Sequence, residues 1–175
     1  MNLKLKLGII ISILSFSLIL INCGYRLSGT GSFLPPYIKT ISVPMFKNNT
    51  GRYQLDQKFT QAVINELIAR GRFKILSETG KADAILLGEI NSFTVNPISF
   101  TEEGRADRYS ITIVAKVTFK DLIKKKILFT NSHYVFRDEY EITSGGDFYS
   151  EETIAIERIS EKFARSVVSL IVEGF

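Results

Sequence analysis

Only one cysteine and one histidine occur in this sequence, and these residue types often act as nucleophile, base or zinc ligand. His133 falls within a predicted strand. Without a second histidine or a free thiol it cannot assemble a typical zinc site or a nucleophile–base pair. Gly145-Gly146 does not join a strand to a helix with the glycine spacing of a phosphate-binding loop. We therefore expect no enzyme, no metal site and no cofactor, which leaves the thiol of Cys23 as the main chemical feature.

Cys23 directly follows a segment that is typical of a secretory signal peptide. The segment starts with two lysines and no acidic residue, and residues 7–21 form a nearly unbroken apolar run. A membrane-spanning helix needs about 20 apolar residues, so a retained anchor is the less favoured alternative. Leu20-Ile21-Asn22-Cys23 resembles the lipobox of bacterial lipoproteins, in which the cysteine sulfur carries a diacylglycerol and becomes the first residue after cleavage. Asn22 stands where that pattern has Gly, Ala or Ser.

These features divide the chain into three parts: a lipoprotein signal peptide (1–22), a lipidated tether rich in Gly, Ser and Pro (23–37), and a folded domain (38–175). Two or three acyl chains would anchor the protein stably on a membrane. Removing residues 1–22 takes away two lysines from the 22 basic residues, so 20 basic residues remain against 18 acidic ones. This near balance argues against nucleic-acid binding. Because the single cysteine would be lipidated, no disulfide is expected.

Two clusters of basic residues flank the longest predicted strand. Arg105 and Arg108 lie at the turn leading into it, and Lys124-Lys125-Lys126 lie at a hairpin tip at its other end. Ordinary solvated loops would have the same composition. Alternatively, the guanidinium groups could bind lipid phosphates bidentately, and the lysines could face membrane headgroups.

The periodicity of apolar residues predicts the elements that must position these residues. Alternation predicts strands, and apolar residues three and four apart predict amphipathic helices. The predicted strands span residues 39–46, 73–76, 82–95, 109–120 and 127–136, and the helices run from Leu55 to Gly71 and from Ser150 to Leu170. We therefore predict a two-layer α/β (α+β) sandwich, with two helices on one face of a mostly antiparallel sheet. The alternation over 109–120 leaves the other sheet face largely polar.

Several segments of the chain resemble the LptE family of lipopolysaccharide-assembly lipoproteins. They are Cys23-Gly24-Tyr25-Arg26-Leu27, Ile38-Lys39-Thr40-Ile41-Ser42-Val43 and Ala106-Asp107-Arg108-Tyr109-Ser110-Ile111. The resemblance implies an outer-membrane lipoprotein on the periplasmic side with two helices on a four-stranded sheet. Such proteins insert as a plug into the β-barrel protein LptD, which delivers lipopolysaccharide to the outer leaflet. By the same resemblance, Arg105 and Arg108 are the candidates for contact with lipopolysaccharide, and Gly24 after the cysteine permits transport to the outer membrane.

A second resemblance keeps another interpretation open. Ile41-Ser42-Val43-Pro44-Met45-Phe46 and Gly71-Arg72-Phe73-Lys74-Ile75-Leu76 are similar to periplasmic lipoproteins of the penicillin-binding-protein activator type and to the amino-terminal domain of TolB. Those proteins are interaction modules with a related strand–helix–strand opening. Both resemblances imply a protein that binds partners and not an enzyme.

Overall fold

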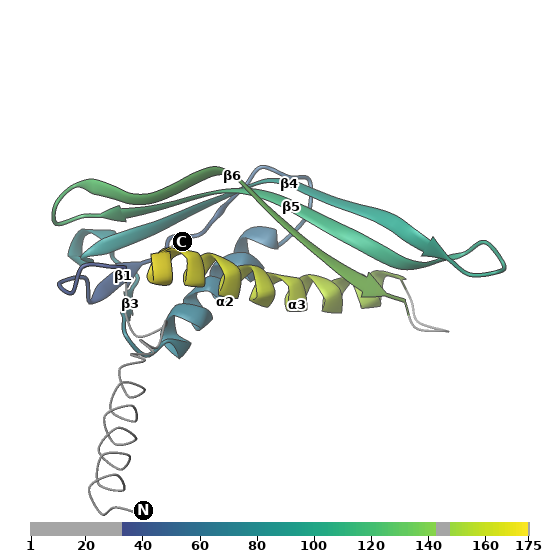
Figure 1. Ribbon diagram of the computed structural model, residues 1–175, viewed down its shortest axis with the longest axis horizontal. Helices are drawn as coiled ribbons and strands as arrows, with labels where there is room; N and C mark the ends of the chain where they lie inside the picture. The colour runs from purple at the N-terminus through teal and green to yellow at the C-terminus, as the bar shows by residue number, and fades with distance from the viewer. Residues whose placement is uncertain (1–32, 143–147, 175) are drawn as a thin grey trace, which may run out of the picture. The chain divides into compact units, whose positions relative to one another are not determined.

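The structure, a computed structural model, describes residues 33–142 and 148–174, which form a sheet covered on one face by two helices (Figure 1). The strands are β1 (Thr40–Ser42), β2 (Lys47–Asn48), β3 (Lys74–Leu76), β4 (Ala84–Phe100), β5 (Ala106–Asp121) and β6 (Lys126–Glu141). The helices are α2 (Leu55–Ala69) and α3 (Phe148–Ser169), and a short 3-10 turn, η2 (Thr79–Lys81), precedes β4. The predicted α+β class with two helices on one face is confirmed.

The predicted sheet of four mostly antiparallel strands is wrong in number and in direction. The described sheet has six strands in the order β3-β1-β4-β5-β6, with β2 also pairing with β4. Strands β4, β5 and β6 are antiparallel, whereas β1 and β2 pair with β4 in parallel and β1 pairs with β3 in parallel. The parallel part arises because α2 carries the chain back across the sheet between the short strands.

The single strand predicted over residues 39–46 is divided into β1 and β2. Pro44 lies in the gap, and proline lacks the N–H that a sheet ladder needs. Past the proline, Phe46 turns inward and its backbone N–H donates to the hydroxyl of Thr60 on α2 at 2.8 Å. The Phe46 ring lies directly on Gly88 of β4, where any Cβ would overlap it. The break between β1 and β2 therefore places the Phe46 side chain in the core.

Both helices present the apolar stripes that their spacing predicts. Leu55, Phe59 and Val63 of α2 are completely buried, and Gly71 ends that helix with a φ of 65°, a conformation that glycine adopts readily. On α3, Ile159, Phe163 and Val167 are completely buried. Helix α3 begins at Phe148, two residues before the start predicted at Ser150, so Ser150 lies inside the first turn. A π-helical turn, η3 (Leu170–Gly174), follows.

Phe163 is the centre of the contact between the two layers. Its ring meets Phe59 of α2 edge-on at 5.0 Å between centroids, and it meets Tyr134 and Phe136 of β6 at 5.6 and 5.9 Å. Edge-to-face aromatic pairs add to the free energy of burying the rings. One side chain therefore joins α3 both to its partner helix and to the sheet.

Candidate interaction surface

The sheet face opposite the helices is not covered by any other described element (Figure 1). We call it the outer sheet face, and the register of β4, β5 and β6 brings its side chains into rows across the strands. Its uncharged polar residues are Ser92, Thr94, Asn96, Ser110, Thr112, Thr118 and Thr130, and the apolar side chains of Leu87, Val114 and Val135 lie among them. The sequence alternation over 109–120 predicted this polar face, and the structure confirms it for β5.

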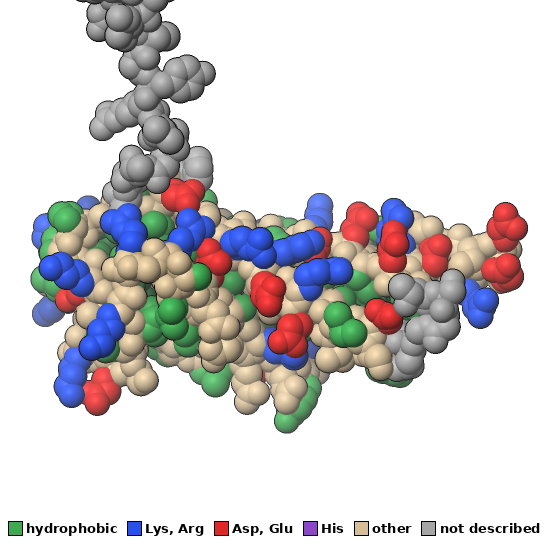
Figure 2. Space-filling view, turned by 90° about the horizontal axis from the view of Figure 1, so that it is seen from below, with side chains coloured by type: hydrophobic (Ala, Val, Ile, Leu, Met, Phe, Trp, Pro, Cys, Tyr) green, Lys and Arg blue, Asp and Glu red, His purple; other side chains and the backbone are tan. Residues whose placement is uncertain are grey.

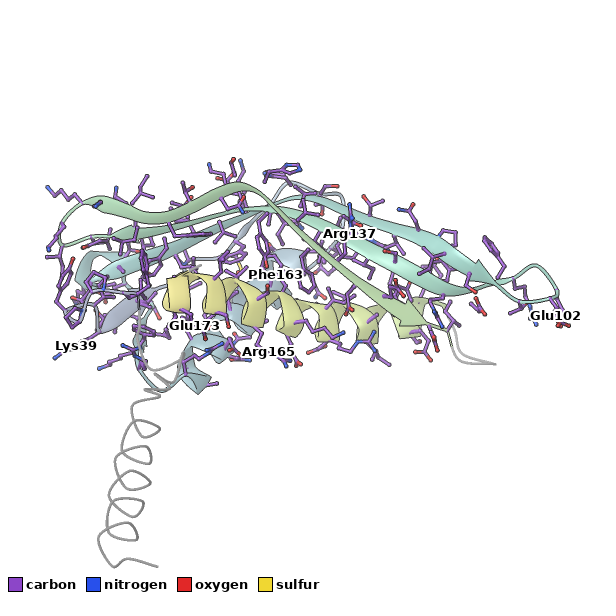
Figure 3. The ribbon with its side chains drawn as sticks, in the orientation of Figure 1. Lys39, Glu102, Arg137, Phe163, Arg165 and Glu173 are labelled. Carbon is purple, nitrogen blue, oxygen red and sulfur yellow. The ribbon has the colours of Figure 1, made fainter. Side chains whose placement is uncertain are left out.

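Charged residues also lie on the outer sheet face: Glu89, Lys116, Lys120, Arg137 and Glu139. Lys116 donates to Glu89 at 3.0 Å, and Thr118 and Thr130 share a hydrogen bond at 3.1 Å. Arg137, labelled in Figure 3, pairs in register with Thr112 and forms no ion pair with any described residue. A surface of hydroxyls and amides can exchange hydrogen bonds with a polar partner.

The helix side of the domain differs in chemistry. Its ion pairs join α2 to α3 through Lys58 and Glu157, and α3 to β6 through Lys162 and Asp138. The Asp138 side chain is only 18% exposed, and its carboxylate accepts hydrogen bonds from the ammonium of Lys162. Exposed pairs of this kind contribute little stability and are compatible with a solvated surface.

Arg105 and Arg108 lie where the sequence placed them, at the turn between β4 and β5 and at the start of β5. Their surroundings are more acidic than expected. Arg108 donates to Glu141 of β6 at 2.5 Å, and Arg105 shares its turn with Glu102 and Glu103. The carboxylates partly offset the two cations, so an anion meets a weaker positive field here than the arginines alone would give.

The lysine cluster lies at the opposite end of β5, as predicted. Lys124 and Lys125 are in the turn between β5 and β6, and Lys126 begins β6. The ammonium of Lys124 lies 4.8 Å from the centre of the Tyr37 ring, a cation–π contact. The Tyr37 hydroxyl donates to the buried carboxylate of Asp121 at 2.5 Å. This contact joins the segment before β1 to the hairpin.

The remaining predicted sites differ in outcome. Cys23 lies outside the described residues. His133 is exposed on β6, and its backbone N–H donates to Asn131 at 2.9 Å. Within residues 33–142 and 148–174, no group of three or more metal-ligating side chains comes together. None of the described helices has the length and apolar character needed to cross a membrane.

A groove of about 590 Å³ lies beside α2 and α3. Its polar lining includes amides and hydroxyls, Lys58 and two glutamates of α3. Because its lining contains neither a histidine nor a cysteine, it provides no nucleophile–base pair of the common types.

Sequence reasoning missed two long-range contacts. Tyr37 and Asp121 are 84 residues apart in the chain, and Arg52 and Glu152 are 100 residues apart. Glu152 is nearly completely buried and forms an ion pair with Arg52, which also lies 5.6 Å from the centre of the Phe93 ring. No local pattern signals such pairs, because each partner taken alone is an ordinary polar residue of a loop or helix end.

Solved structures of other bacterial proteins share this fold. A hypothetical protein from Chlamydia trachomatis matches with a TM-score of 0.54 and 11% identity over 78% of this chain and 96% of that chain. A protein from Xanthomonas campestris matches with a TM-score of 0.53 and 10% identity over 78% and 87%. Rare lipoprotein B from Shewanella oneidensis gives a TM-score of 0.47 and 12% identity over 76% and 90%. At these identities, the two matches with TM-scores above 0.5 establish the fold alone.

Comparison of the sequence with family models gives a more specific result. No curated protein sequence is similar enough to this chain to count as a relative. The model of the LptE family, described as lipopolysaccharide-assembly, matches residues 38–171, which include every described strand and helix from β1 to α3. The match confirms the resemblance drawn from the sequence and covers well over half of the chain, so this chain belongs to the LptE family.

Proposed function

We propose that this protein is an outer-membrane lipoprotein, anchored through lipid on Cys23, that partners and plugs an LptD-type β-barrel in lipopolysaccharide assembly. Family membership makes it a lipopolysaccharide-assembly lipoprotein of the bacterial envelope. The barrel partner, the plug role and the outer-membrane location are our inferences from that membership and from the surface of the domain. The role that we propose is binding and not catalysis.

The observation that carries the proposal is the composition of the outer sheet face. Transmembrane barrels have a polar interior, so a plug needs a polar surface that can hydrogen-bond to the barrel wall. The rows of Thr, Ser and Asn on β4 and β5 supply such a surface across three long antiparallel strands. The large exposed apolar side chains of this face, Leu87 and Val135, are separated in the register by the pair of Glu89 and Lys116, so they form no continuous apolar patch.

Site-specific photo-crosslinking in the intact envelope tests which face meets the barrel. We expect a photoreactive residue at Thr112, at the centre of the outer sheet face, to crosslink to the barrel protein. The same group at Lys81, whose side chain is 75% exposed on η2, serves as the control and should give little barrel crosslink. Strong crosslinking from Lys81 with none from Thr112 would contradict the assignment of the outer sheet face.

Contact with lipopolysaccharide through Arg105 and Arg108 is a separate proposal. Guanidinium groups can bind phosphates bidentately, and both arginines lie at the same end of the sheet. Because Arg108 is already paired with Glu141, we expect Arg105 to contribute more. The double variant Arg105→Glu and Arg108→Glu reverses both charges and should weaken lipopolysaccharide binding about tenfold. This estimate assigns a binding free energy of about 1 kcal/mol or slightly less to each exposed contact. Unchanged binding with an intact fold would remove both residues from the site.

A further inference from the structure

We propose that the tip of the β5–β6 hairpin, residues 122–127, docks on an anionic phospholipid surface beside the lipid anchor. This inference rests on the proposed lipid attachment at Cys23. The hairpin tip combines two kinds of exposed side chain: Ile123 and Ile127 are 55% and 54% exposed, and the three lysines between them are exposed as well. Apolar side chains flanked by lysines are the composition of segments that lie in a membrane interface.

The hairpin tip is attached directly to the segment that leads to the anchor. Tyr37 contacts the hairpin through its hydrogen bond to Asp121 and through the ammonium of Lys124. Phe33 and Leu34 line an apolar cavity of about 180 Å³ together with Leu128 and Phe129, which directly follow the tip. The start of the described chain and the hairpin therefore form one end of the domain.

The length of the tether keeps this end near the membrane. Tyr37 follows Cys23 by fourteen residues in the sequence. A fully extended chain spans at most about 3.5 Å per residue, so Tyr37 cannot lie more than about 50 Å from the lipidated sulfur. The hairpin tip thus experiences a high effective concentration of lipid headgroups.

The charge distribution of the described domain also favours contact between this end and an anionic surface. Lys39 and Glu102 lie at opposite ends of the domain in Figure 3, and Figure 2 shows Lys and Arg side chains gathered toward the Lys39 end. The acidic residue nearest the hairpin tip, Asp121, carries one negative charge against the three lysines, so the tip keeps a net positive charge. Asp121 accepts hydrogen bonds from Tyr37 and from the backbone N–H of Lys124, and Asp83 accepts from the backbone of residues 39 and 40. Lys124, Lys125 and Lys126 form no ion pair among the described residues.

Contact with a phospholipid surface explains why the hairpin tip carries both lysines and exposed isoleucines. Anionic headgroups attract each nearby lysine by about 1 kcal/mol, which corresponds to about a fivefold shift in occupancy per residue. The boundary between headgroups and acyl chains also removes the isoleucine side chains from water. The polar lumen of a barrel would satisfy the lysines but leave Ile123 and Ile127 without apolar contact.

Tryptophan fluorescence can report the immersion of the hairpin tip, because the natural chain contains no tryptophan. The mature lipoprotein is placed in vesicles of phosphatidylethanolamine and phosphatidylglycerol with brominated acyl chains, after mass spectrometry has confirmed diacylglycerol on Cys23. We expect the Ile123→Trp variant to show a blue-shifted emission and strong quenching by bromine. The control is Ile154→Trp on α3, where the native side chain is 63% exposed, and it should show neither effect. Absence of quenching at position 123, or equal quenching at both positions, would overturn the proposal.

A second comparison tests the role of charge. Replacing Lys124, Lys125 and Lys126 by Gln in the Ile123→Trp background should reduce the occupancy of the docked state by about two orders of magnitude at low salt. A matched variant loses three cations of the helix side instead (Lys58→Gln, Lys162→Gln and Arg165→Gln) and should keep the quenching. An equal loss of quenching in both triple variants, or no loss of quenching in the tip variant, would overturn the proposal.

Failure of this inference can be distinguished from failure of the proposed function. A mature chain without lipid on Cys23 would count against the anchor itself. We expect the tip variant with three Gln residues still to co-purify with the barrel protein, because its outer sheet face is unchanged. Loss of barrel co-purification in that variant would mean that the hairpin tip contacts the barrel and would overturn membrane docking.

Discussion

The hydrogen bond between Tyr37 and Asp121 connects the tether side of the chain to the far end of the long hairpin. Asp121 is completely buried, and burial raises the pKa of its carboxyl group. Hydrogen bonds from the Tyr37 hydroxyl and from the backbone N–H groups of Lys124 and Ile123 outweigh that effect and lower the pKa overall. The same bond to Asp121 raises the pKa of Tyr37 to about 12. A single carboxylate thus shapes the turn and holds the segment before β1.

We expect Asp121→Asn to lower the free energy of unfolding by about 2 kcal/mol at pH 7, because hydrogen bonds to a buried charged group are lost or weakened. A carboxyl group whose pKa is lower in the folded state stabilises the fold above its unfolded pKa, and this contribution is lost as the pH falls through the folded pKa. Urea unfolding from pH 7 to pH 2 should therefore show the two proteins converging below about pH 4. Glu161→Gln, at an exposed position of α3, is the control. A difference that stays constant across this range would show that the charge of Asp121 is not the cause.

At the scale of elements, the positions of the strands and helices were predictable from the sequence, but the pairing of the short strands was not. The strict alternation over 109–120 predicted β5, and the apolar spacing of three and four residues predicted α2 and α3. The short strands β1 and β3 have three residues each and lie within the predicted strands 39–46 and 73–76. Their parallel pairing with each other depends on where α2 returns the chain. This pairing is determined by tertiary packing, so it cannot be predicted from a local sequence pattern.

Phe163 provides the test of how the helix layer is held to the sheet. We expect Phe163→Ala to lower the free energy of unfolding by about 3–5 kcal/mol, because it removes a completely buried ring that contacts both α2 and β6. Phe100→Ala, at a side chain that is 60% exposed, should change it by less than about 0.5 kcal/mol. Urea denaturation of both variants measures the difference. A loss at Phe163 as small as that at Phe100 would mean that α3 is not held through this ring.

At the scale of the whole molecule, the described domain presents surfaces of three different kinds. The outer sheet face is rich in Thr, Ser and Asn, the helix side carries ion pairs between its elements, and the hairpin tip combines lysines with exposed isoleucines. The sequence predicted the polar face and the basic tip, because both follow from local composition. It did not predict that Glu141 would pair with Arg108 or that Tyr37 would contact the hairpin, since both depend on strand register and long-range packing. The proposed plug and the proposed membrane contact use different surfaces, so the protein could make both contacts at once.

Affinity purification of the native lipoprotein from its own envelope, followed by identification of the co-purifying proteins, tests the central claim most directly. We predict recovery of an LptD-type β-barrel protein in a stable complex, reduced by bulky charged substitutions at Thr94 and Thr112 of the outer sheet face. Matched substitutions at Gln61 and Lys81, which are exposed outside that face, should reduce recovery less. Recovery of a peptidoglycan synthase without any barrel protein would contradict the account and favour the activator-type interpretation.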